Sequence, residues 1–434
     1  MTVRFLSVEV FCLAALVLFW TRQRRKETKT EIGGSALALL FVLAFAVRAW
    51  YASRDIWFGF DVGCFKSWGD LAYDGLKLLY NSGRYVDYPP FAMYFFAVAG
   101  GIRELAGLSY ESVEFTFLIK LVGIASDIGM CALVYACAKS RLDRRRALLL
   151  AAFWAFCPMV IYDSSVWGQI DGLLMVLLAL TVMLLAEDRP ASAGIACRAA
   201  LMTKPQAILT GPVLLYCMIA EKDNRKLMKA VCAGIISIIL IVLPFTQGLD
   251  ISWIVTLYRN TLKSYGMFTV NGYNLYYLLD LNWKEFSAFP AGRYINWVVI
   301  PLCLALYGCA FRKLRRKYAN GGAMFICAYM YIVTVFCLCT MMHERYMFCA
   351  AGFALMAYIY TQKDRMLYLF LLSSACSFLN SAAVFVSYHG ETTSRSMGCF
   401  IALLTMACLA ASLVFLFRET TGADGEKAAR EGDN

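Results

Sequence analysis

Residues 115–138 read FTFLIKLVGIASDIGMCALVYACA, an apolar run interrupted by only two charged side chains, Lys120 and Asp127. A helix of about 20 apolar residues crosses the hydrocarbon core of a bilayer, so this run predicts a transmembrane helix. Water is absent at that depth. We therefore expect Asp127 to face the interior of a helix bundle and to pair there, with Lys120 or with a group from an external loop.

The rest of the chain has the same character. Of its 434 residues, 61% are hydrophobic and 16% are charged, whereas soluble domains carry about 25% charged residues. The predicted fold class is therefore an all-α polytopic membrane protein. Its spans, about thirteen, are predicted near residues 4–20, 33–50, 115–138, 148–163, 171–186, 194–207, 208–220, 227–244, 294–311, 321–342, 346–361, 366–386 and 397–417.

Two of these segments, 194–207 and 208–220, are short and are separated by the sequence TKPQ. Discontinuous helices of this kind often border a binding site in membrane proteins.

The loops predict the orientation of the chain. Four short basic loops fall on one side when thirteen spans are assumed, and basic loops stay in the cytoplasm. They are TRQRRKETKT (21–30), KSRLDRRR (139–146), EKDNRKLMK (221–229) and FRKLRRK (311–317). The formal charge of +11 reflects such loops, and no nucleic-acid partner is expected.

The opposite, external side holds two long loops, 51–114 and 245–293. Residues 57–72 have a helical period, with Trp57, Phe60, Cys64, Trp68 and Leu71 on one face. Residues 88–106 are apolar enough to span. Counting them as a span would place the basic loops outside, so we expect a helix lying against the outer interface.

Three regions follow from these spans. Residues 1–32 form a first N-terminal span with its basic cytoplasmic loop, and residues 33–417 form the main transmembrane domain. Residues 418–434 are polar and poor in aromatic residues, which predicts a disordered cytoplasmic tail.

The 17 cysteines are scattered, mostly through the apolar runs. No paired spacing indicates a zinc site or a disulfide framework. We interpret them as small hydrophobic residues and expect no metal site.

Asp61 lies in the first long loop among Trp57, Phe65 and Trp68. An apolar surround makes a carboxylate a better proton acceptor near neutral pH, as a general base requires. A place in the first turn of a helix favours the ionised form. The alternative is an ordinary water-facing residue at a helix start, and Asp55 and Asp70 are rival acids in the same loop.

Other polar and aromatic side chains gather at the predicted external helix ends. Their alternative roles are interface anchors, snorkelling cations and packed loop residues. They are Tyr88 in DYPP, Trp167, Gln169 and Asp171 in VWGQID, Lys204 and Gln206 in TKPQ, Asn271 and Asn274 in VNGYN, and His343, Glu344 and Arg345 in HERY.

The order of these motifs is itself informative. An acid in the first external loop is followed by YPPF, ASDIG, VWGQID, TKPQA, VNGYNLYY and HERY. This set, over roughly residues 33–390, resembles the GT-C superfamily of polyprenyl-phosphate-sugar-dependent glycosyltransferases, and within it bacterial Gpi18-like mannosyltransferases. GT-C proteins commonly have one span before the catalytic loop. This chain has two, so its first span looks like an addition.

The resemblance implies a GT-C-like bundle in a bacterial-type plasma membrane, with its active site on the external face. It implies an inverting transfer of a hexose, with mannose favoured, from a polyprenyl-phosphate donor to a glycan, glycolipid or protein. Asp61 would be the catalytic base. Lys204 and the HERY residues would lie near the donor phosphate, and no metal or other cofactor is implied.

A transporter or lipid-carrier flippase is the alternative function, because such proteins also combine many spans, broken helices and buried charges. A non-catalytic membrane scaffold is a third possibility. The sequence has no obvious inverted repeat, and its polar groups gather on one side rather than at the midplane of the bilayer. Both observations favour the glycosyltransferase interpretation.

Overall fold

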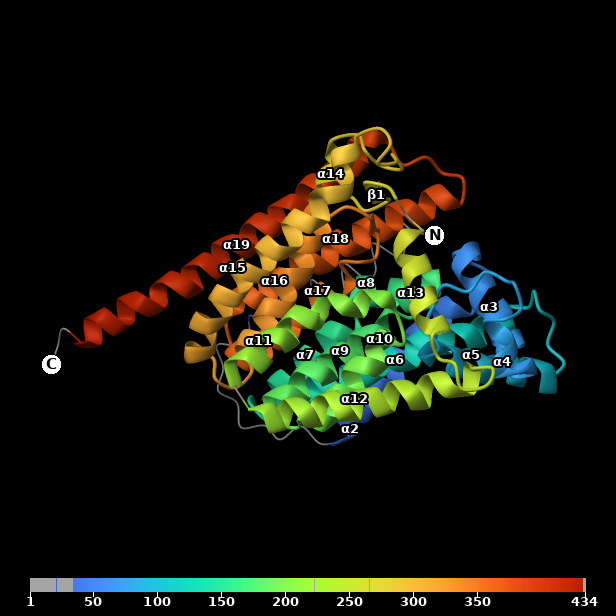
Figure 1. Ribbon diagram of the computed structural model, residues 1–434, viewed down its shortest axis with the longest axis horizontal. Helices are drawn as coiled ribbons and strands as arrows, with labels where there is room; N and C mark the ends of the chain where they lie inside the picture. The colour runs from blue at the N-terminus through green and yellow to red at the C-terminus, as the bar shows by residue number, and fades with distance from the viewer. Residues whose placement is uncertain (1–20, 22–33, 222, 265, 432–434) are drawn as a thin grey trace. The chain divides into compact units, whose positions relative to one another are not determined.

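The computed structural model describes residue 21 and residues 34–221, 223–264 and 266–431 (Figure 1). The predicted first span, 4–20, lies outside the described residues.

The predicted all-α class is confirmed, since the described chain is helical apart from loops and one small sheet. That sheet consists of β1 (Thr269–Val270) and β2 (Met342–His343), which pair in parallel. The helices are α2 (Gly34–Ala52), α3 (Gly59–Asp74), α4 (Leu76–Leu79), α5 (Phe91–Leu105), α6 (Val113–Lys139), α7 (Arg144–Ala155), α8 (Pro158–Ile161), η1 (Tyr162–Trp167), α9 (Asp171–Ala186), α10 (Pro190–Leu201), η2 (Pro205–Thr210), α11 (Gly211–Glu221), α12 (Asn224–Val242), η3 (Leu243–Phe245), α13 (Trp253–Lys263), α14 (Leu275–Leu278), η4 (Pro290–Tyr294), α15 (Ile295–Lys317), α16 (Gly322–Leu338), α17 (Phe348–Thr361), α18 (Asp364–Tyr388) and α19 (Arg395–Glu431).

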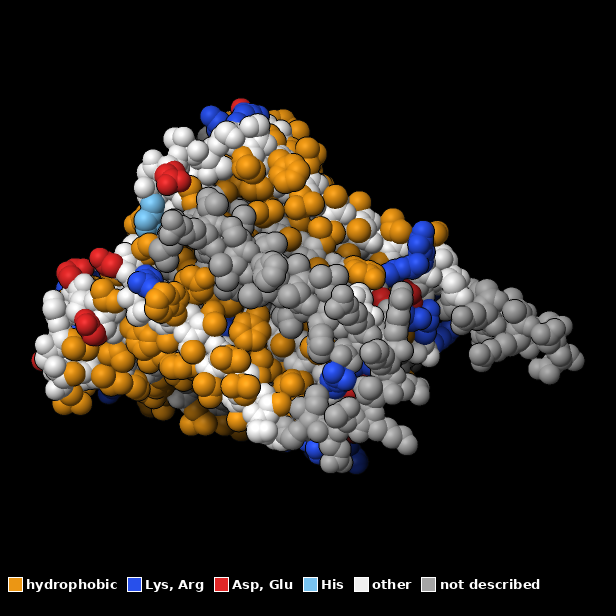
Figure 2. All heavy atoms as spheres, turned by 180° about the vertical axis from the view of Figure 1, so that it is seen from behind, with side chains coloured by type: hydrophobic (Ala, Val, Ile, Leu, Met, Phe, Trp, Pro, Cys, Tyr) orange, Lys and Arg blue, Asp and Glu red, His pale blue; other side chains and the backbone are white. Residues whose placement is uncertain are grey.

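Six helical segments of the described chain are long and apolar enough to cross a membrane, or seven if the bent pair of 144–155 and 158–167 forms one span. Three shorter apolar helices, α9, α16 and α17, add to these, and the total of thirteen stays a prediction. Figure 2 shows hydrophobic side chains over large parts of the described surface. Exposed Leu43 on α2, Leu240 on α12 and Trp297 on α15 belong to such outward apolar faces, which suit lipid contact.

The predicted break at TKPQ is confirmed. α10 ends at Leu201, and the chain resumes as the short 3₁₀ helix η2 from Pro205 before α11 begins at Gly211. Pro205 has no backbone N–H to continue a helix, and a proline disfavours helical geometry in the residue before it.

Contacts divide the chain into two compact units. Unit 1 comprises residues 1–178, 194–207 and 231–262, and unit 2 comprises residues 179–193, 208–230 and 263–434. The predicted boundaries at 32/33 and 417/418 do not coincide with this division and stay a prediction.

In unit 1, the first long loop contains α3, α4 and α5, as expected for a loop with its own helices. Gly69 of α3 and Gly100 of α5 bring two backbones together, because a Cβ on Gly100 would lie 2.5 Å from the carbonyl oxygen of Gly69. This contact sets which face of α3 is buried. Phe60 was predicted on that face, but it is 57% exposed, whereas Phe65 and Trp68 are buried.

The predicted helix at 88–106 is α5, which has 15 residues. At 1.5 Å per residue it is about 22 Å long, shorter than the hydrocarbon core of about 30 Å. Its length fits the prediction that this segment does not span, and its place at the interface stays a prediction.

The two charges in α6 have separate partners. Asp127 is buried and pairs with Arg48 of α2, whose Nε lies 3.0 Å from Asp127 Oδ2. The expectation of a buried pair is therefore correct, but the suggested partner Lys120 is wrong. Lys120 instead donates a hydrogen bond to the carbonyl oxygen of Ile56 at 3.0 Å.

In unit 2, neighbouring helices in the sequence pack in pairs from α15 to α19, and α19 also contacts α14, α15 and α16. The last helix, α19, continues to Glu431, and the expected disorder of the tail stays a prediction. Ala, Glu, Lys and Arg in that segment are good helix formers.

Candidate active site

Asp61 lies in the first turn of α3, as the helical period predicted, and is half-buried. Its Oδ2 accepts two hydrogen bonds, one from Trp167 Nε1 at 2.6 Å and one from Gln169 Nε2 at 2.7 Å. Both donors are themselves buried. A carboxylate held by two donors from one loop has a defined orientation at the start of its helix.

The loop that supplies these donors is built by an unusual local fold. η1 is a π-helix that ends at Trp167, and Gly168 follows with φ of 96°. The carbonyl oxygen of Asp163 accepts hydrogen bonds from the amides of Gly168 and Gln169 at 3.0 and 2.8 Å. This turn points the side chains of Trp167 and Gln169 toward Asp61. π-helical turns of this kind occur frequently at functional sites.

The Trp167 indole is held from the side of α3. Its ring stacks on Phe58 with a centroid distance of 4.3 Å, and its carbonyl oxygen accepts a hydrogen bond from the Phe58 amide at 3.1 Å. Phe58 immediately precedes α3. The loop therefore contacts the start of the helix that carries Asp61 through a ring stack and through a backbone hydrogen bond.

Gln169 connects Asp61 to a buried lysine. Its Oε1 accepts hydrogen bonds from Lys204 Nζ at 2.8 Å and from the Tyr88 hydroxyl at 3.3 Å. Lys204 is fully buried and forms an ion pair with Asp171 at the start of α9. An amide that accepts from Lys204 must present its NH₂ group to Asp61, so the lysine sets the amide orientation.

Among the described residues, the hydrogen-bonded network contains two carboxyls, Asp61 and Asp171, and one lysine, Lys204. A third carboxyl, Asp87, lies close enough to interact electrostatically with Asp61 and Lys204. Asp87 was not proposed from the sequence, although it begins the motif DYPP. Burial raises the pKa of the Asp87 carboxyl, while a hydrogen bond from Tyr85 acts in the opposite direction and the charge of Asp61 adds to the rise. Its place two residues before the pair of prolines was the available signal.

Two rival acids in the first long loop lie elsewhere. Asp55 is exposed. Asp70 pairs with Arg103 at 2.9 Å and lines a hollow of about 380 Å³ together with Arg84 and Tyr110. Neither has a hydrogen bond to Trp167 or Gln169 within the described chain.

The HERY residues belong to unit 2. His343 ends β2, and its ring lies 5.1 Å from the Tyr346 ring. Glu344 and Arg345 are mostly buried, with 3.1 Å between Glu344 Oε1 and Arg345 Nη1. The charge of Arg345 is therefore adjacent to that of Glu344, and the role of these residues at a donor phosphate stays a prediction.

The two asparagines of VNGYN have structural partners. Asn274 caps α14 by accepting a hydrogen bond from the Tyr276 amide at 3.0 Å, and its Nδ2 donates to the carbonyl oxygen of Phe336 at 2.9 Å. Asn271, with φ of 59°, accepts a hydrogen bond from Trp283 Nε1 at 2.8 Å. These contacts hold the loop around β1 in place. They agree with the alternative that both asparagines are packed loop residues.

One network within unit 1 thus joins six of the residues proposed from the sequence. Gln206 lies in η2 and contributes no hydrogen bond to it in the described structure. The network consists of Asp61, Tyr88, Trp167, Gln169, Asp171 and Lys204.

In the part of the chain that the structure describes, no group of three or more His, Cys, Asp or Glu side chains is arranged to hold a metal ion. The expectation that no cofactor is needed stays a prediction.

The sequence model of glycosyltransferase family 87 matches residues 85–340, more than half of the chain. No curated protein matches. The crystal structure of ArnT from Cupriavidus metallidurans bound to undecaprenyl phosphate matches with a TM-score of 0.46 and 14% identity, covering 90% of this chain and 78% of that one.

Proposed function

Since the chain belongs to glycosyltransferase family 87, we propose that it moves a hexose from a polyprenyl-phosphate carrier to an acceptor, with Asp61 as the general base. The acceptor is a glycan, glycolipid or protein outside a bacterial-type plasma membrane. Mannose is the first candidate sugar, on the resemblance of the motifs to Gpi18-like proteins. The multi-pass membrane fold suits a donor whose carrier stays in the bilayer.

The observation that carries this proposal is the fixed carboxylate of Asp61. Trp167 and Gln169 hold Oδ2 at 2.6 and 2.7 Å, and Asp61 remains half-exposed at the start of α3. A base in a defined orientation accepts the proton of an acceptor hydroxyl as that oxygen attacks the anomeric carbon. The bond to the lipid phosphate breaks on the opposite face, which inverts the configuration of the sugar.

The leaving phosphate needs positive charge or hydrogen-bond donors. Arg345 and His343 have the right chemistry, because a guanidinium binds a phosphate through charge-assisted hydrogen bonds. We place Lys204 in a different role from the one that the resemblance implies. Its ion pair with Asp171 and its complete burial favour orienting Gln169 over contacting the donor.

The proposal is tested by sugar transfer from defined donors. The purified protein is reconstituted in vesicles with membrane acceptor lipids, and polyprenyl-phosphate-mannose and polyprenyl-phosphate-glucose are supplied with the sugar radiolabelled. We expect labelled product from one lipid donor and none from the matching nucleotide sugar. Movement of the labelled lipid between leaflets without any product would contradict the proposal and favour a flippase.

Gly168 provides a test of the loop geometry. A Cβ at this position would lie 2.6 Å from Val62 Cγ2, and φ of 96° is unfavourable for alanine. Gly168→Ala is expected to displace Trp167 and Gln169 and to lower transfer by about 10²-fold, the effect of a misplaced catalytic group.

The matched control is Gly63→Ala, two residues from Asp61 in α3. Nothing lies within 4 Å of a Cβ built there, so near-normal transfer is expected. Equal activity of the two variants would show that the turn at Gly168 does not position the base.

A further inference from the structure

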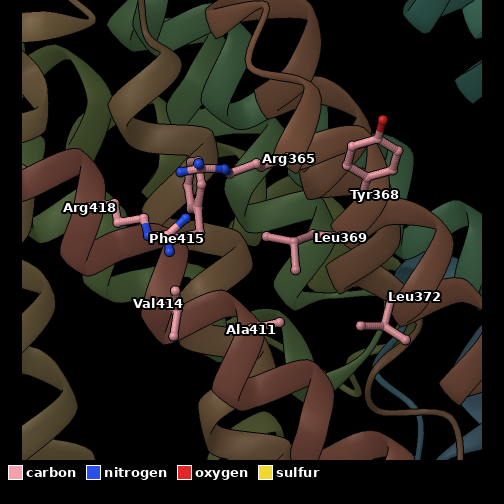
Figure 3. A pocket seen from close by; sticks show the side chains of 8 residues that line it. All are labelled: Arg365, Tyr368, Leu369, Leu372, Ala411, Val414, Phe415 and Arg418. Atoms are coloured by element: carbon pink, nitrogen blue, oxygen red, sulfur yellow. The ribbon is translucent and has the colours of Figure 1, made fainter.

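A groove in unit 2 has no part in the site described above. It lies between α18 and α19, has a volume of about 300 Å³, and is open to the surface. Its walls are apolar, with Leu369 and Leu372 from α18 and Val414 and Phe415 from α19 (Figure 3). This volume is at the lower end of the range of about 300 to 1,000 Å³ for small-molecule pockets.

Two arginines lie at one end of this groove. Arg365 comes from α18 and Arg418 from α19, and Figure 3 shows both guanidinium groups directed to the same region beside Phe415. Both side chains are exposed. No ion pair joins either arginine to a carboxylate in the described part of the chain. The nearby acid Glu419 is paired with Lys317 at 2.8 Å.

The arginines lie where a membrane surface is expected. Both helices are long and apolar enough to span. Arg365 is the second residue of α18, and Arg418 follows the apolar part of α19. The exposed side chains that follow into the span are apolar or aromatic, such as Tyr368 and Val414. A lipid in contact with both helices would place its tail along the groove and its phosphate near the arginines.

We propose that this groove binds one anionic phospholipid of the surrounding bilayer. An acyl chain lies along Leu369, Leu372 and Val414, and the phosphate lies between Arg365 and Arg418. A guanidinium holds a phosphate through paired hydrogen bonds, which a lysine does not reproduce. Two acids adjoin these arginines in the sequence: Glu419 is paired with Lys317, and Asp364 also has a partner. Neither is free for the amine of a zwitterionic headgroup, so an anionic headgroup is favoured.

The test is native mass spectrometry of the full chain, titrated with phosphatidylglycerol or phosphatidylcholine in detergent. We expect one phosphatidylglycerol to bind more tightly than phosphatidylcholine. In the variant Arg365→Gln/Arg418→Gln, the affinity for phosphatidylglycerol is expected to fall by about 10- to 30-fold. This estimate follows from a contribution of about 1 kcal/mol per basic residue near a membrane surface. Ala411→Phe, which adds a ring at the groove, is expected to weaken binding while both charges remain.

The charge-matched control is Arg312→Gln/Arg316→Gln in the last turns of α15, which removes two exposed arginines outside the groove. An equal loss of affinity in this control would overturn the proposal, since net charge alone would explain binding. Equal affinity for the two phospholipids would do the same. Tighter binding of undecaprenyl phosphate than of phosphatidylglycerol would replace the bilayer lipid by the carrier lipid. The readout requires no sugar transfer, so it is independent of the proposed activity.

Discussion

Replacing Asp61 by asparagine is expected to lower sugar transfer by about 10²- to 10⁴-fold, the usual contribution of a positioned general base. Asparagine keeps the size of the side chain and an oxygen that accepts hydrogen bonds from Trp167 and Gln169. It is not basic enough to take a proton from the acceptor hydroxyl. The measurement is the transfer rate at saturating donor, together with the thermal unfolding temperature.

The controls for this result are the rival acids Asp55 and Asp70. Asp55→Asn removes an exposed charge. Asp70→Asn removes the partly exposed ion pair with Arg103, which costs about 1 kcal/mol or less. Both variants are expected to keep most of the transfer activity. An active Asp61→Asn protein together with an inactive Asp70→Asn protein would move the base to Asp70.

Replacing Lys204 by methionine is expected to have a large effect on both stability and activity. Lys204 is fully buried and paired with Asp171. Removing one partner of a buried pair costs about 3 to 5 kcal/mol, because the other charge stays buried without compensation. Gln169 also loses the donor that orients its amide toward Asp61. We expect a lower unfolding temperature and a transfer rate close to that of Asp61→Asn.

A double variant separates these two effects. In Lys204→Met/Asp171→Leu both charges are replaced by apolar groups, and such replacements of buried pairs are often neutral or stabilising. Stability is therefore expected to recover, while transfer stays low because Gln169 still lacks its lysine. Recovery of transfer together with stability would show that the lysine acts only through folding.

The exposed ion pair between Arg395 and Asp280 provides the matched comparison for the buried one. Arg395→Met removes a cation of similar length from a surface pair, for which the cost is about 1 kcal/mol or less. An equal loss of stability in Arg395→Met and Lys204→Met would show that burial of the ion pair does not increase the cost of losing its cation.

The presence of the long helices was predictable from the sequence, because it depends on the properties of consecutive residues. Long apolar runs produced α2, α6, α12, α15, α18 and α19, and the break at TKPQ followed from Pro205. The helix containing Asp61 followed from its period. The partner of Asp127 was not predictable, because Arg48 lies 79 residues away in the sequence and pairs with it only through helix packing.

In the candidate site, too, the sequence predicted some features and only the structure revealed others. The motifs VWGQID, TKPQ and DYPP identified Trp167, Gln169, Lys204 and Tyr88 as residues of interest, because polar groups beside membrane spans are costly without a partner or a function. They did not reveal that Gln169 bridges Asp61 and Lys204. Nor did they reveal that Lys204 is neutralised by Asp171, or that Phe60 lies outside the buried face of α3.

From the amino-acid order alone, one can therefore derive a many-helix membrane protein, its broken helix, and an acid at the start of a loop helix. Hydrophobic length and helical period act over about 20 consecutive residues. The direction in which Gln169 presents its amide depends on residues from three distant segments. Only tertiary packing brings α3, the turn at Gly168 and the residue before Pro205 together, and that packing orients the carboxylate of Asp61.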